Sequence, residues 1–166
     1  MAIYKTTGAL MLGTRLRRLS DAFLLEISRI YRSLGIEFEA PWFPVFYLLR
    51  QHGSISISLL AGELEVSQSA VSQMIVQLEK RGLIQVARRD CDRRVRYVSL
   101  TDSGKELLAQ VLPVWKEIQQ TVESMMGDDN ASRMLLHALE QFEGEMERTP
   151  MSEAVLARLS NSREAL

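Results

Sequence analysis

The sequence predicts a mainly α-helical protein with one small β-hairpin. In most segments of the 166-residue chain, apolar residues recur every three or four positions, which is the period of an amphipathic helix. Residues 83–86 change to an extended pattern, and residues 95–100 alternate apolar with polar side chains, as antiparallel strands do. A hydrophobic content of 46% with 25% charged residues can fill a core, so a disordered chain is excluded. The length fits one domain or two small ones.

Two helices are predicted in the N-terminal part of the chain. The first spans residues 13–34 and carries one apolar stripe, and Gly35 ends it. The second spans residues 42–51, with Pro41 at its first position and Gly53 after its end. Because this second helix is apolar nearly all round, we expect it to be buried.

A short helix and a longer one follow, joined by a tight connection. Ser56 is the expected N-cap of the third helix, which ends near Glu65. Ser67 is the expected N-cap of the fourth helix, which runs to about Arg81 and is closed by Gly82. The inward face of this fourth helix is expected to consist of Val71, Met74, Ile75 and Leu78.

Helices return after the hairpin. Residues 101–104 start a long helix whose apolar positions keep a step near 3.5 residues, and Pro113 is expected to bend it because proline removes one backbone hydrogen bond. A last amphipathic helix follows, and residues 150–166 form either a tail or one more short helix.

The order of these elements has a functional meaning. A short helix, a tight turn, a second helix with a polar outer face and an arginine-tipped hairpin follow one another as in a winged helix-turn-helix, which reads DNA. Hydroxyl and amide side chains can hydrogen-bond base edges in the major groove, whereas Lys80 and Arg81 at the far end are expected to contact phosphates. The predicted contact residues of this helix are Ser67, Gln68, Ser69, Ser72, Gln73, Gln77 and Lys80.

The hairpin tip is the second predicted contact. Arg93 and Arg94 are expected to enter the minor groove, and Asp92 is expected to pair with a neighbouring arginine and fix the turn. Residues 67–100 hold seven basic and three acidic residues, a net charge of +4, although the whole chain carries −1. The alternative is an ordinary solvated hairpin.

Several short motifs in this region resemble the MarR family of winged-helix transcription regulators. They are Leu59-Leu60-Ala61, Val66-Ser67, Val71-Ser72, residues 78–84 (Leu-Glu-Lys-Arg-Gly-Leu-Ile), Asp92-Arg93-Arg94, and Leu100-Thr101 with Gly104. The resemblance spans about residues 13–147. It implies a homodimer that binds a pseudo-palindromic operator, acts as a repressor, and often responds to a small aromatic or phenolic ligand. It also implies that Arg94 is the minor-groove arginine and Asp92 its partner in the wing.

The resemblance divides the chain into regions. Residues 1–34 and 101–149 are expected to form a helical dimerisation region, and residues 35–100 the winged helix-turn-helix. Many relatives carry arginine where this sequence has Gln73, so their base preference does not transfer.

The N-terminal stretch is similar to a narrower subgroup in which such a regulator is fused to a GNAT-type acetyltransferase. This chain contains no acetyltransferase domain, so it is either a free-standing relative or one half of a former fusion. A second function therefore stays open at this point. The winged helix could be a regulatory or interaction module that partners an acetyltransferase or another enzyme.

An aromatic set is placed where the first, second and fifth helices are expected to meet. It is either ordinary core or, as the resemblance implies, the lining of a pocket for a small aromatic effector. The residues concerned are Phe23, Trp42, Phe46, Tyr47 and Trp115.

Other chemistry is not predicted. The sequence offers no nucleophile with a base, no phosphate-binding glycine loop and no paired carboxylates, so we expect neither an enzyme nor a cofactor. His52 and His137 are isolated, which argues against a metal site. Cys91 is either an oxidisable sensor or a tolerated exposed thiol. No secretory signal or membrane span is recognised, so a cytoplasmic location is expected.

Overall fold

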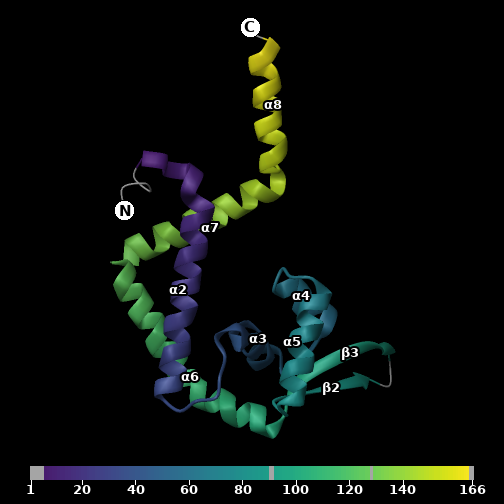
Figure 1. Cartoon of the computed structure of the whole chain (residues 1–166). Helices are drawn as coiled ribbons and strands as arrows, with labels where there is room; N and C mark the ends of the chain where they lie inside the picture. Colours follow the sequence, from purple (N-terminus) through teal and green to yellow (C-terminus); the bar gives the residue numbers. More distant parts are fainter. Residues whose placement is uncertain (1–5, 90–91, 128, 165–166) are drawn as a thin grey trace. The chain divides into compact units, whose positions relative to one another are not determined.

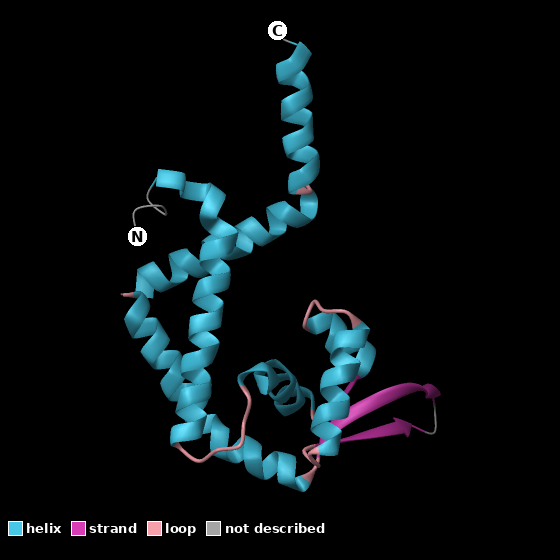
Figure 2. Cartoon of the chain, in the orientation of Figure 1, coloured by secondary structure: helices cyan, strands magenta, loops and turns pink. Residues whose placement is uncertain are grey.

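The computed structural model describes residues 6–89, 92–127 and 129–164, and it confirms a mainly helical chain with a small sheet (Figures 1 and 2). The helices are η1 (Gly8–Met11), α2 (Leu12–Ser33), η2 (Ala40–Trp42), α3 (Phe43–His52), α4 (Ile57–Glu63), α5 (Gln68–Lys80), α6 (Asp102–Met126), α7 (Asp129–Arg148) and α8 (Met151–Glu164). The strands are β1 (Ser54–Ser56), β2 (Ile84–Arg89) and β3 (Asp92–Leu100). The chain divides into two compact units, Met1–Val114 and Trp115–Leu166.

Helix boundaries in the first unit follow the predicted signals. Ser56 and Ser67 cap α4 and α5, because their Oγ atoms accept hydrogen bonds from the backbone N–H groups of Leu59 and Ala70, each at 3.2 Å. Gly53 follows α3 with a φ of +66°, a left-handed conformation that glycine adopts without strain. The predicted caps and glycine stops are therefore confirmed.

The sheet has three strands rather than the two of the predicted hairpin. All neighbours are antiparallel, the strand order is β1-β3-β2, and Ile55 at the centre of β1 pairs with Val98 and is buried. A three-residue strand with one apolar side chain leaves no periodic signal, and its pairing partner lies more than 40 residues away in sequence. The sequence analysis missed β1 for this reason.

The core of the first unit is built around α3. Its side chains Val45, Phe46 and Leu49 are buried, as expected of a helix that is apolar nearly all round. The Phe38 ring lies at its end, with edge-to-face contacts to Tyr31, Trp42 and Phe46 at centroid distances of 5.0 to 5.6 Å. This aromatic cluster joins the end of α2 to α3.

A close backbone contact attaches α6 to the wing. Thr101 caps α6 by accepting from the Gly104 N–H at 3.1 Å, and its hydroxyl also donates to the Gly82 carbonyl. The Thr101 N–H donates to the Leu83 carbonyl at 3.1 Å. The Leu-Thr-x-x-Gly motif thus ties the start of α6 to the turn that follows α5.

The second unit contains the rest of α6 with α7 and α8. Pro113 lies inside α6, one residue before the boundary between the units, and the bend there stays a prediction. Residues 151–164 form a helix, so that alternative is confirmed over a tail. The described helices include none that is long and apolar enough to cross a membrane.

Candidate nucleic-acid interface

Helix α5 presents a polar face on the side opposite its core contacts. Val71, Ile75 and Leu78 are buried, at 0 to 2% exposure, and fix the rotation of the helix. Their spacing leaves one face of side chains that are exposed, except for the half-buried Ser72. Its polar members are Gln68, Ser69, Ser72, Gln73, Gln77 and Lys80, which we call the α5 polar face, and the exposed Val76 lies among them. The structure thus brings these predicted contact residues together.

Ser67 differs from the other predicted contact residues. Its Oγ accepts from the Ala70 N–H and lies 2.9 Å from the Ser69 Oγ. The hydroxyl of Ser67 is therefore engaged at the start of the helix, where it keeps the first turn of α5 in place. Its predicted contact with DNA stays a prediction.

Lys80 and Arg81 are neighbours with different surroundings. Lys80 is exposed and makes no ion pair with another described residue. The Nη2 atom of Arg81 lies 2.7 Å from the Glu39 Oε1, and its guanidinium sits 4.8 Å from the centre of the Trp42 ring. Arg81 therefore attaches the end of α5 to the residues at η2, and we expect this structural role rather than the phosphate contact predicted from the sequence.

The wing consists of β2 and β3, which pair closely up to a register shift between Arg88 and Arg89. Both strands run nearer to the tip than the sequence pattern predicted. The side chains of Asp92, Arg93 and Arg94 and the whole of Cys91 lie outside the described part of the chain. Their predicted roles stay predictions.

Two arginines on the wing strands were not singled out from the sequence as contacts. On the face of the sheet that covers the core, Ile84 pairs with Leu100 and Val86 with Val98. The next pair in this row is Arg88 with Arg96, both exposed. The period of two in a strand places residues 84, 86 and 88 on one face of the sheet. This period would have indicated Arg88 if the predicted strands had been extended toward the tip.

The aromatic set predicted to line a ligand pocket is divided. Trp42 and Phe46 are buried in the core cluster, whereas Phe23 and Tyr47 are exposed at 44 and 40%. Trp115 belongs to the second unit. The aromatic effector stays a prediction.

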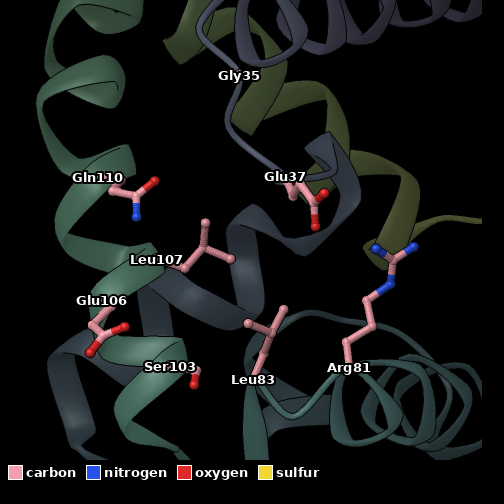
Figure 3. A pocket seen from close by; sticks show the side chains of 8 residues that line it. All are labelled: Gly35, Glu37, Arg81, Leu83, Ser103, Glu106, Leu107 and Gln110. Atoms are coloured by element: carbon pink, nitrogen blue, oxygen red, sulfur yellow. The ribbon is translucent and has the colours of Figure 1, made fainter.

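A different cavity, of about 400 Å³, lies at the junction of the loop after α2, the end of α5 and the start of α6 (Figure 3). Figure 3 shows Ser103, Glu106, Leu107 and Gln110 on α6 facing Leu83, with Glu37 and Arg81 on the other side. Its lining is more polar than the predicted aromatic one. Within the residues that the structure describes, no group of three His, Cys, Asp or Glu side chains could hold a metal ion.

Comparison with known proteins agrees with this geometry. The sequence model of the MarR family matches residues 39–95. The chain is 37% identical over 81 residues to the HTH-type transcriptional repressor MdtR of Bacillus subtilis, which covers 49% of this chain and 52% of that protein. It is 31% identical over 102 residues to the transcriptional repressor MprA of Escherichia coli, covering 57% of each. The chain thus spans about half the length of these curated relatives, both of which are named as transcriptional repressors.

A solved structure extends the likeness to the fold. A mutant of the E. coli regulator MarR, in complex with operator DNA, superposes with a TM-score of 0.69 at 20% identity over 79% of this chain and 92% of that one. The predicted fold class, mainly α with a small β wing, is confirmed by this likeness and by the three-stranded sheet. Residues 39–95 are thus similar to the MarR family of winged-helix transcriptional regulators, and the fold of the chain is that of a winged helix-turn-helix.

Proposed function

We propose that this protein is a sequence-specific DNA-binding transcriptional regulator, and that it acts as a homodimeric repressor on a pseudo-palindromic operator. The observation that carries the proposal is the α5 polar face, which stands exposed beside the basic wing within the segment that matches the MarR family. The two curated relatives described above are both repressors.

The chemistry of the α5 polar face suits the major groove. Gln73 projects from the exposed side of the helix and can donate to and accept from an adenine edge at the same time. Lys80 is placed two turns further on, where a cation fixes register by contact with a phosphate. The wing arginines Arg93 and Arg94 would read the width of the adjoining minor groove.

The dimer in the proposal is supported by uncovered apolar surface. In α2, Leu19 is 60% exposed and Phe23 44%, although both lie on the stripe expected to be covered. Two reading heads related by a twofold axis would contact half-sites about 34 to 36 Å apart on one side of the duplex.

The proposal is tested by selecting fragments of the source genome with the purified protein and titrating the recovered duplex against salt. We expect a specific site with a steep fall of affinity as salt rises, because each neutralised phosphate contributes a slope of about −0.9. Binding that does not distinguish the selected duplex from random DNA would overturn the proposal.

Two substitutions separate the roles within the interface. Gln73→Ala should relax base preference at one position per half-site by about 1–3 kcal/mol, whereas Arg94→Ala should weaken binding to all sequences. Gln51→Ala, at an exposed glutamine near the end of α3, is the matched control and should leave both the base preference and the overall affinity unchanged. If the first two variants bind like the wild type, the assigned reading surface is wrong.

A further inference from the structure

A second hollow in the first unit lies between the reading helix and the wing. It has a volume of about 200 Å³ and is lined by Ile57, Ser58, Gln68, Val95 and Arg96. Three elements meet there: the first turn of α4, the first turn of α5 and strand β3. Among the residues whose side chains the structure describes, the polar groups that line it are a hydroxyl, an amide and a guanidinium, with no carboxylate.

The guanidinium of Arg96 is placed there by the register of the sheet. Residues 96, 98 and 100 share one face of β3, and Val98 and Leu100 are buried under the helices. Arg96 is the next residue outward on the same face, where the apolar cover ends, and it lines the hollow together with Gln68 at the start of α5.

The pairing of Arg96 is electrostatically unfavourable within the chain. Arg88 stands directly opposite it on β2, and like charges at this position destabilise a sheet. Neither arginine has an ion-pair partner in the described part of the chain. An anion held at the hollow would relieve this repulsion, and the positive end of the α5 dipole next to Gln68 favours the same charge.

The donors match a phosphate. A guanidinium offers up to five N–H groups, and the Gln68 amide and the Ser58 hydroxyl, which lies 3.2 Å from the Ser56 Oγ, line the same space. The larger cavity at the start of α6 differs in this respect. It is lined by Glu37 and Glu106, and its arginine, Arg81, is already paired with Glu39.

We infer that Arg96, with Ser58 and Gln68, holds one phosphate of the DNA backbone in this hollow. The inference rests on the proposed function. If α5 occupies the major groove and the wing tip the neighbouring minor groove, the strand that separates the two grooves must pass between helix and wing. The hollow lies at that place, so the phosphate held there sets the depth and register of the reading helix.

The experiment uses the full-length protein and the duplex recovered by genomic selection, with single uncharged methylphosphonate linkages placed in turn along each strand. For the wild type, we expect several linkages in each half-site to respond to neutralisation, because Lys80 also contacts a phosphate, and the one at the hollow should weaken binding about tenfold. For Arg96→Gln, binding should be about tenfold weaker for each half-site, and only the linkage at the hollow should have no further effect. The salt slope of Arg96→Gln should be smaller by about 0.9 per half-site.

Arg88→Gln is the matched control, because Arg88 faces Arg96 but does not line the hollow. This variant should keep the wild-type sensitivity to the same linkage, and Arg96→Lys should recover the salt slope because it restores the charge. Ser58→Ala provides a second variant of the site. We expect it to weaken binding about threefold for each half-site, because a neutral hydrogen bond contributes about half the free energy of a charge-assisted one.

The outcomes separate this inference from the proposed function. A wild type that selects no duplex overturns both. A wild type that binds its duplex specifically, while Arg96→Gln shows the same linkage profile and salt slope, overturns the phosphate site and leaves the regulator in place.

Discussion

At Gly104, helix α6 packs tightly against the backbone of the first unit. A Cβ atom built at this position would lie 2.0 Å from the Leu83 carbonyl oxygen, which also accepts a hydrogen bond from the Thr101 N–H. Because that oxygen is part of the backbone, it cannot move aside as a flexible side chain does. A buried glycine is therefore required in the motif that links the wing to α6.

We expect Gly104→Ala to lower the free energy of unfolding by about 1–3 kcal/mol, as overpacking in a core does. A loss of stability would be informative, because replacing glycine by alanine inside a helix ordinarily raises the free energy of unfolding by about 1 kcal/mol. Urea unfolding followed by circular dichroism measures the change. Gly62→Ala in α4, where a Cβ meets nothing within 4 Å, is the control and should be neutral or stabilising. Equal stability of the Gly104 variant and the wild type would contradict the packing.

A second prediction at this scale concerns Asp102 in the first turn of α6. Lys105 Nζ donates a hydrogen bond to the Asp102 Oδ1 at 2.8 Å, and this bond and the charge of Lys105 lower the pKa of the carboxyl below its ordinary value of 3.8. The resulting stabilisation is present above that ordinary value and is lost as the pH falls through the lowered pKa.

An NMR titration of the Asp102 carboxyl carbon should give a pKa below 3.8 in the wild type, and the pKa should rise in Lys105→Met. Lys105→Arg keeps the charge and should keep the pKa low. A pKa of Asp102 that is the same in the wild type and the methionine variant would show that the pair does not persist in solution.

At the end of helix α5, the neighbouring cations Lys80 and Arg81 are expected to have different functions, the first in DNA binding and the second in stability. Lys80→Ala should reduce the salt slope of DNA binding by about 0.9 per half-site while leaving the thermal unfolding temperature unchanged. Arg81→Ala removes the exposed pair with Glu39 and the contact with the Trp42 ring, so it should lower the stability by about 1 kcal/mol and leave the slope unchanged. Differential scanning fluorimetry and a salt titration of both variants provide the measurements. An Arg81 variant that loses salt slope without losing stability would reverse this assignment.

For the whole molecule, the distribution of charge is as informative as the total. Residues 67–100 carry a net +4, whereas residues 101–166 hold six basic and twelve acidic residues, a net of −6. A duplex would attract the first segment and repel the second, which favours docking through the winged helix. A net charge near zero thus conceals a polarised chain.

The oligomeric state is the second prediction that concerns the whole molecule. Sedimentation equilibrium at micromolar concentration should give twice the 18.9 kDa mass of the chain. Phe23→Glu combined with Leu19→Glu should shift the mass to that of one chain and weaken operator binding by more than tenfold, since one protomer contacts one half-site. Leu59→Glu, at a leucine of α4 that is 50% exposed, should leave the mass unchanged. A wild type that sediments as a single chain would remove the dimer from the proposal.

Features that depend on near neighbours along the chain follow from the amino-acid sequence alone. Helix periods, the Ser56 and Ser67 caps and the glycine stops were predictable because they arise from contacts within about four residues. The exposed face of α5 followed from the same period. The order of these elements was sufficient to predict a winged helix-turn-helix.

Features that join residues far apart in sequence depended on how the elements pack. Arg81 reaches back 42 positions to Glu39, β1 exists through its pairing with β3, and Arg96 lines one hollow with Gln68. Trp42 and Phe46 are buried in the core, where both contact the Phe38 ring. No local period encodes such contacts, because they depend on how elements pack once the apolar faces are buried.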